Sequence, residues 1–262
     1  MQPALQSSER ATLESISAIR TWTPGLYSFK TTRPPEYRFA AGQYARLGLL
    51  TPQGHLVWRA YSIVSASTDD ELEYYVIDVP GGAFTSQLRQ LVPGDPILLD
   101  RQSLGVMLPE RFTDGEDLWM LATGTGLGPF IAILREATVW QRFRHLVLVH
   151  SVRHPEEFSY RDELLELQRA HDSEMAELRL LQTCTRVQPV GEEAHLHGRI
   201  TTLLQNGELE RHAGLKLMAE SSRVMLCGNP AMIDEMRELL KERGMRPVRR
   251  DTPGQYLAEN YW

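Results

Sequence analysis

Four consecutive residues, Arg59, Ala60, Tyr61 and Ser62, combine side chains that suit one large phosphorylated ligand. The segment alternates as a β-strand does, so Arg59 and Tyr61 share one face while Ser62 lies on the other. An arginine fork binds phosphate, and a tyrosine ring stacks on a flat ligand. The same tetrapeptide also fits a half-buried strand with a surface cation, so its meaning depends on the rest of the chain.

A glycine-rich turn, Thr123 to Pro129, follows a buried apolar run and opens a helical pattern. At such a junction, backbone N–H groups and the positive end of a helix meet a phosphate. Pro129 replaces the third glycine of the dinucleotide fingerprint, so the match to that motif is incomplete. The next strand ends in Ser151-Val152-Arg153 rather than in a carboxylate, and Arg186 and Arg199 lie near later strand ends. One such cation also fits a solvated surface, but three together predict a phosphate site for NADP rather than NAD.

A third segment, Cys227-Gly228-Asn229-Pro230, ends one predicted strand and begins a helix. It fits a buried small thiol followed by a tight turn with proline at the helix start. It equally fits a thiol beside the reacting carbon of a nicotinamide, with Gly228 allowing close approach. The residues themselves leave both interpretations open.

The elements that must position these residues change character midway along the chain. Up to about Asp100 the pattern has period two with frequent turn signals, which predicts a closed or nearly closed antiparallel barrel. One helix, Phe84 to Leu91, interrupts it. The predicted strands are Leu13 to Ser17, Leu26 to Lys30, Tyr44 to Leu49, Trp58 to Val64, Leu72 to Val79 and Ile97 to Leu99.

After Pro109 to Gly115, strands and helices alternate, which predicts right-handed crossovers and a parallel sheet. We therefore expect a barrel domain over residues 1–108 and an α/β domain over residues 109–262. The predicted strands are Leu118 to Ala122, His145 to His150, Leu178 to Cys184 and Val224 to Cys227. The predicted helices are Pro129 to Gln141, Tyr160 to Ala170, Ile200 to Asn206 and Pro230 to Arg243.

The composition limits the class of protein. The 262 residues are 42% hydrophobic and 24% charged, as in a globular protein with substantial cores. A net charge of −6 disfavours nucleic-acid binding. No apolar run suits a membrane span, and the N-terminus lacks a signal-peptide pattern, so we expect a cytoplasmic protein without membrane contact. Two cysteines are too few for a disulfide framework, a zinc ribbon or an iron–sulfur cluster, and we expect no metal.

The three motifs occur in order and are followed by the tail Ala258-Glu259-Asn260-Tyr261-Trp262. In this combination the chain resembles the ferredoxin–NADP reductase family, and more narrowly its bacterial ferredoxin/flavodoxin–NADP reductases that end in an aromatic pair. The resemblance implies an N-terminal antiparallel Greek-key β-barrel that binds FAD and a C-terminal α/β domain with a parallel sheet that binds NADP. It implies electron transfer between NADPH, as hydride, and ferredoxin or flavodoxin, in single-electron steps, with NADPH as the donor.

Carried onto this sequence, the resemblance assigns roles around the flavin. Arg59 binds the pyrophosphate, Tyr61 stacks on the ring, and Ser62 hydrogen-bonds the ring nitrogen that accepts hydride. Ala258 takes the ring-covering position and Trp262 stacks on the adenine, where plant-type members end in a covering tyrosine. The other implied FAD contacts are Ala60, Tyr75, Val76, Ile77, Asp78 (through its backbone), Ala83, Phe84, Thr85 and Thr125, of which Thr125 touches both cofactors.

On the NADP side the implied contacts come from strand ends and one helix start. Cys227 and Glu259 are placed at the nicotinamide–flavin contact and, with Ser62, form the implied catalytic set. The implied NADP contacts are Val152, Arg153, Thr185, Arg186, Arg199, Asn229, Pro230 and Ala231.

The implied partners are acidic proteins, so we expect a transient electrostatic complex made by a monomer. A cluster of Arg246, Arg249 and Arg250, extended by Arg33, Arg38 and Arg46, is the predicted docking patch, with a solvated face as the alternative. Two other functions stay open. One is a flavin or oxygenase-system reductase on the same two domains, and the other is a non-catalytic NADP-binding regulator.

Overall fold

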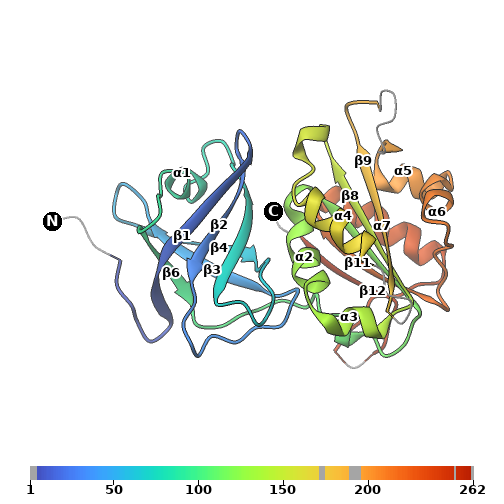
Figure 1. The fold of residues 1–262 in the computed structure, drawn as a ribbon, viewed down its shortest axis with the longest axis horizontal. Coiled ribbons are helices and arrows are strands. Elements are labelled where there is room, and N and C mark those ends of the chain that lie inside the picture. Colours follow the sequence, from blue (N-terminus) through green and yellow to red (C-terminus); the bar gives the residue numbers. More distant parts are fainter. Residues whose placement is uncertain (1–4, 171–174, 189–195, 251, 261–262) are drawn as a thin grey trace.

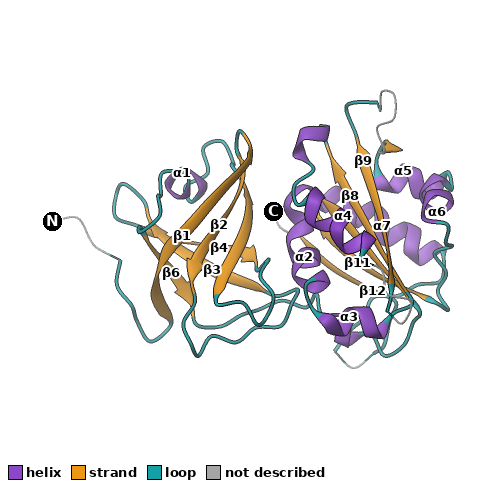
Figure 2. Ribbon diagram, in the orientation of Figure 1, coloured by secondary structure: helices purple, strands orange, loops and turns teal. Residues whose placement is uncertain are grey.

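The computed structural model describes residues 5–170, 175–188, 196–250 and 252–260, so the predicted FAD contact at Trp262 lies outside the described residues. Two domains lie side by side along the long axis of the molecule (Figure 1). The first is built from strands and the second from strands covered by helices (Figure 2). The predicted boundary at residues 108 and 109 falls in the segment between the two sheets, and it stays a prediction.

The first domain is the predicted antiparallel barrel. Its strands pair in the order β4-β3-β6-β1-β2-β5, and a bridge between Ile63 and Tyr74 joins the two ends of this sheet. Alternating apolar residues such as Phe29, Leu47 and Leu99 fill the interior because successive side chains on a strand point to opposite faces. The elements are β1 (Ala11–Thr23), β2 (Leu26–Thr32), β3 (Tyr44–Leu50), β4 (Leu56–Ser62), β5 (Glu71–Ile77), α1 (Thr85–Leu88) and β6 (Pro96–Asp100).

The second domain is the predicted α/β domain, with parallel strands in the order β10-β9-β8-β7-β11-β12. Helices α2 to α4 pack on one face of this sheet and α5 to α7 on the other. Within the described residues, no helix combines the length and apolar character needed to cross a bilayer. The elements are η1 (Pro109–Arg111), β7 (Asp117–Thr123), η2 (Gly124–Leu127), α2 (Gly128–Leu134), α3 (Ala137–Arg142), β8 (His145–Val152), η3 (Pro155–Glu157), α4 (Arg161–Arg169), β9 (Glu177–Cys184), β10 (Leu196–His197), α5 (Ile200–Gln205), α6 (Glu208–Ala213), β11 (Ser222–Gly228), α7 (Pro230–Glu242) and β12 (Tyr256–Asn260).

The prediction of one helix from Pro129 to Gln141 is wrong, because the segment forms two helices, α2 and α3. Glu136 between them has extended backbone angles, φ −92° and ψ 131°. Its carboxylate accepts a hydrogen bond from the Ser67 N–H of the barrel at 2.6 Å. A contact with the other domain therefore outweighs the local helical periodicity.

The C-terminal tail forms a strand that the sequence did not predict. Strand β12 pairs in parallel with β11, so that Ala258 lies beside Leu226 and Glu259 beside Cys227. The short elements α6 and β10 were also not predicted. The tail thus returns to the carboxyl edge of the sheet as its last strand.

Polar contacts fix the two domains against each other. The guanidinium of Arg135, the residue that caps the end of α2, donates to the Val64 carbonyl and to Glu73 of the barrel, both at 3.0 Å. It also pairs with Glu163 of α4 at 2.7 Å. The Tyr160 hydroxyl donates to the second oxygen of Glu73 at 2.8 Å. Because Glu73 is buried and shares two partners from the second domain, these bonds define how the domains meet.

Candidate functional site

Two cavities meet where the domains join. The barrel cavity, about 290 Å³, lies at the end of β4 and β5. The sheet-edge cavity, about 500 Å³, lies at the carboxyl ends of the parallel strands. Thr125 and Ile77 line both cavities, so the two spaces are neighbours across the domain junction. A ligand in the barrel cavity and a ligand in the sheet-edge cavity would therefore meet at these two residues.

The barrel cavity gathers most of the residues predicted to contact FAD. It is lined by Arg59, Ala60, Tyr61, Ser62, Tyr75, Val76, Ile77, Ala83, Phe84, Thr85 and Thr125, together with Val79 and Gly82. Ladder pairing fixes the motif strand, since Tyr61 is the register partner of Ala45 and Ser62 that of Tyr44. The segment first singled out in the sequence is therefore one wall of a cavity.

The residues of this wall become more buried toward the inner end of β4. Arg59 is exposed and its guanidinium donates to the Trp58 carbonyl at 2.8 Å. The Tyr61 ring lies 5.6 Å from the Phe84 ring, centroid to centroid, and burial raises the pKa of Tyr61, which keeps the phenol protonated. Ser62 is 9% exposed and lies against the start of α2, where a Cβ at Gly128 would be 3.4 Å from the Ser62 Cβ.

A tight loop forms the rim of the barrel cavity. The Thr85 hydroxyl donates to the Val79 carbonyl at 3.1 Å and closes the loop. A Cβ at Gly82 would lie 2.6 Å from the Thr85 Oγ1, so only glycine fits at this point. The cavity thus combines an aromatic wall, a cation at the end of that wall and a tight loop that contains glycine. These features fit a flat ring with a phosphorylated chain, as FAD has.

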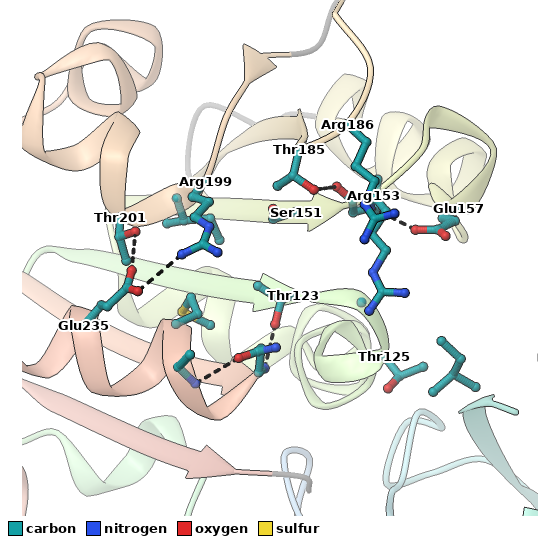
Figure 3. Close-up of a pocket in the computed structure, with 17 residues that line it drawn as sticks. Thr123, Thr125, Ser151, Arg153, Glu157, Thr185, Arg186, Arg199, Thr201 and Glu235 are labelled. Carbon is teal, nitrogen blue, oxygen red and sulfur yellow. Dashed lines mark hydrogen bonds and ion pairs between the residues drawn. The ribbon is translucent and has the colours of Figure 1, made fainter. Parts of the chain in front are cut away.

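The sheet-edge cavity lies where the strand order reverses between β7 and β11, the position at which α/β sheets bind ligands. Side chains from several strand ends point into it (Figure 3). The predicted NADP contacts among its lining residues are Val152, Arg153, Thr185, Arg186, Arg199, Asn229 and Ala231. Ser151, Glu157, Thr201, Met232 and Glu235 also line it and were not predicted.

Two glycines allow the floor of this cavity to form. Gly228 has φ +129°, and a Cβ there would lie 2.1 Å from the Thr123 Oγ1. A Cβ at Gly126 would lie 2.4 Å from the Cys227 carbonyl oxygen. The Thr123 hydroxyl oxygen accepts from the Asn229 N–H at 2.7 Å, and the Asn229 side chain caps α7. The glycine turn and the start of α7 therefore approach closely enough to present backbone N–H groups to one ligand.

A buried histidine forms a hydrogen bond with the glycine turn. The Nε2 of His150 lies 3.1 Å from the Gly124 carbonyl oxygen, which can only accept, so Nε2 carries the proton. Burial lowers the pKa of His150 to about 4, so the ring is neutral at physiological pH. His150 was not predicted as a site residue, because its contact depends on the turn that follows the neighbouring strand β7.

The arginines at this edge have different partners. Arg199 pairs with Glu235 at 3.3 Å, and the Thr201 hydroxyl donates to the other oxygen of Glu235 at 2.8 Å (Figure 3). Arg153 and Arg186 form no ion pair with any residue that the structure describes. Glu235 carried no signal in the sequence, because only the fold brings α7 beside Arg199. A set of cations and backbone N–H groups around one cavity fits a phosphorylated dinucleotide such as NADP.

Several predicted site residues do not line either cavity. Asp78 pairs with Arg89 at 3.3 Å. Cys227 is fully buried in the core beside Met225. Pro230 is the first residue of α7, between two residues that do line the sheet-edge cavity. These three assignments stay predictions.

The two predicted tail contacts lie on β12. Ala258 packs against the core on the α5–α7 face of the sheet. The Glu259 carboxylate accepts a hydrogen bond from the Val106 N–H, in the segment that links the domains. Neither lines the barrel cavity or the sheet-edge cavity, and both stay predictions.

The arginines of the predicted docking patch are dispersed. Arg246 and Arg249 lie at the amino end of β12, at the opposite edge of the sheet from both cavities. In the barrel, the Arg33 guanidinium donates to the backbone carbonyls of Tyr37 and Ser67, while Arg46 pairs with Asp100 at 3.6 Å and Arg38 donates to backbone carbonyls of its own loop. This placement does not favour a single patch near the cavities.

Known proteins resemble this chain over both domains. A model of the oxidoreductase FAD-binding domain matches residues 12–100, and one of the oxidoreductase NAD-binding domain matches residues 120–238. A flavodoxin/ferredoxin–NADP reductase of Shigella flexneri is 39% identical over 248 residues, covering 94% of this chain and 97% of that protein. A ferredoxin–NADP reductase of Azotobacter vinelandii is 36% identical over 253 residues, covering 94% and 96%. The crystal structure of a ferredoxin NADP⁺ reductase from Neisseria gonorrhoeae with bound FAD and NADP gives a TM-score of 0.90 at 39% identity, covering 97% of this chain and 100% of that one.

Proposed function

This chain belongs to the ferredoxin/flavodoxin–NADP reductases, and we propose that it holds FAD in the barrel cavity and NADPH in the sheet-edge cavity and reduces a ferredoxin or flavodoxin. One observation carries this proposal. Thr125 and Ile77 line both cavities, so ligands in the two spaces would touch at the domain junction. Contact of that kind is what hydride transfer requires.

FAD supplies the chemistry that links the two kinds of donor and acceptor, since it takes two electrons as hydride and gives them up singly. The protein contributes binding and orientation. Arg59 would bind the pyrophosphate at the exposed end of the wall, and Tyr61 and Phe84 would hold the flat ring. Ser62, at the inner end of β4 beside α2, would donate its hydroxyl proton in a hydrogen bond to the ring nitrogen that receives hydride.

The arginines provide the preference for NADPH. Arg153, Arg186 and Arg199 line the sheet-edge cavity, and each would bind the 2′-phosphate, which NADH lacks. The neutral His150 fixes the carbonyl of Gly124 and so orients the turn toward the pyrophosphate. Cys227 and Glu259 remain our candidates beside the nicotinamide, and Glu259 would have to release the Val106 N–H to reach it.

We further propose that docking of the acidic partner is transient and electrostatic, and that the enzyme acts as a cytoplasmic monomer. Two arginines near the barrel cavity support docking at its rim. Arg59 lines the cavity and is exposed, and the Arg89 side chain is 68% exposed while it pairs with Asp78. Positive charge at this rim would orient an acidic protein toward the flavin.

Acceptor kinetics test the function and the docking surface together. With NADPH as donor, Arg89→Glu should raise the KM for ferredoxin several-fold, and salt should slow ferredoxin reduction. The matched variant Arg250→Glu, near the far edge of the sheet, should change neither, and ferricyanide reduction should stay normal in both. If only Arg250→Glu and Arg249→Glu impair ferredoxin reduction, the patch predicted from the sequence is the docking surface. A protein that reduces neither acceptor would be a regulator instead of a reductase.

A further inference from the structure

The Arg199–Glu235 pair is one feature of the sheet-edge cavity that phosphate binding does not explain. A carboxylate in a site for a phosphorylated ligand repels that ligand, yet Glu235 lies on the cavity wall beside Arg199 (Figure 3). The pair joins α7 to the residue before α5. The inference below rests on the proposed binding of NADPH in this cavity.

The two partners differ in how firmly they are held. The hydroxyl of Thr201, a residue that is 4% exposed, donates to Glu235 Oε2 at 2.8 Å. The Arg199 side chain is 70% exposed, and its Nη1 is 3.3 Å from Glu235 Oε1. Since an exposed ion pair is weak, Arg199 can leave Glu235 at small cost, while Thr201 retains the carboxylate at the wall.

We propose that Glu235 is a specificity-determining residue. It competes with the 2′-phosphate for Arg199 and so lowers the affinity of the site for NADP⁺ and NADPH. NAD⁺ and NADH carry a hydroxyl at that position, so the competition does not affect them. Glu235 therefore reduces the preference that the three arginines create. The same competition speeds release of NADP⁺ after hydride transfer.

A different role for Glu235 predicts the opposite change. In NAD-dependent enzymes a carboxylate near the ribose accepts hydrogen bonds from its hydroxyls. If Glu235 acted in this way, removing its charge would weaken the binding of NAD⁺. Direct repulsion of the phosphate, without Arg199, would give the same tightening whether or not Arg199 is present.

Binding of NADP⁺ and NAD⁺ to the FAD-loaded protein separates these roles. Glu235→Gln keeps an oxygen that can accept from Thr201, so the melting temperature should not fall. We expect it to tighten NADP⁺ about three- to tenfold at low salt, with NAD⁺ unchanged. The gain should shrink near about 0.5 M salt, because the charges are then screened. It should be absent in an Arg199→Ala background, as a double-mutant cycle would show.

A matched control lies on the same helix. Glu238 pairs with Lys241 at 3.6 Å and its side chain is 72% exposed, so Glu238→Gln removes a charge from α7 without touching the cavity. It should leave the affinity for both nucleotides unchanged. Weaker NADP⁺ binding in Glu235→Gln, an equal gain for NAD⁺, or a gain that persists without Arg199 would each overturn the inference. Should Arg153→Ala and Arg186→Ala also fail to weaken NADP⁺, the proposed NADP site itself would be wrong.

Discussion

The barrel cavity and the sheet-edge cavity are built in different ways. The wall of the first comes from consecutive residues of one strand, Arg59 to Ser62, whose directions are set by the pairing of β4 with β3. The second is assembled from the ends of β7, β8, β9 and β11 and the starts of α5 and α7. The barrel cavity thus depends on the pairing of two strands. The sheet-edge cavity depends on how several strand ends and helix starts pack together.

The two cavities also differ in the chemistry of the side chains that line them. Aromatic rings, Tyr61 and Phe84, and a single exposed arginine suit a cofactor that stays bound. Three arginines, one of them paired with Glu235, suit a charged ligand that must bind and leave in each cycle. We infer from this difference that stacking retains one cofactor, while opposite charges in the second cavity allow exchange of the other.

The largest effect should come from the junction of the glycine turn with β11. In Gly228→Ala the new Cβ would overlap Thr123, and the backbone angle is one that alanine rarely adopts. We expect a loss of more than about 3 kcal/mol in unfolding free energy or complete loss of NADP⁺ binding. Gly244→Ala is the control, since Gly244 also has positive φ, +77°, but a Cβ there meets nothing within 4 Å and the residue does not line the cavity. Equal effects of the two substitutions, by urea unfolding and nucleotide titration, would contradict the close-packed floor.

Ser62→Ala tests the inner end of the barrel cavity. We expect hydride transfer from NADPH to slow about 100-fold while FAD stays bound, because a hydrogen bond to the reacting region is lost. Rapid-mixing measurements of flavin reduction and the FAD content of the purified variant report the two quantities. Loss of FAD would show that Ser62 serves to bind the cofactor. An unchanged rate with FAD retained would show that Ser62 has neither role.

Arg153→Ala and Arg186→Ala address the charged cavity. Each should weaken NADPH by roughly 1.5–3 kcal/mol, the value of a lost charged hydrogen bond, and should affect NADH far less. Titrations with both nucleotides measure the difference. Equal losses for NADPH and NADH would show that these arginines do not bind the 2′-phosphate.

The smallest effect of this set concerns the exposed end of the barrel wall. Arg59→Ala should weaken FAD by about 1–2 kcal/mol, less than a buried contact because Arg59 is solvated. Arg46→Ala, which removes a barrel arginine paired with Asp100, is the control and should retain FAD fully. The fluorescence of FAD released during dialysis provides the measurement. Equal release from both variants would show that Arg59 does not bind FAD.

The sequence was most informative where local periodicity decides the structure. The strand containing Tyr61 and Ser62, and the strand end at Arg153, follow from apolar alternation and turn residues. The break between α2 and α3 did not, because it depends on the contact of Glu136 with Ser67 of the other domain. Glu235 was missed for a similar reason, since only the folded sheet brings α7 beside Arg199.

We propose above that the two cavities hold NADPH and FAD in contact. Anaerobic titration of the FAD-loaded protein with NADPH, followed by the visible spectrum, tests it most directly. We expect the flavin colour to bleach in proportion to added NADPH, and NADH to be a much poorer reductant. A protein that binds FAD and NADPH but keeps its flavin colour would show that the two cofactors are not in contact.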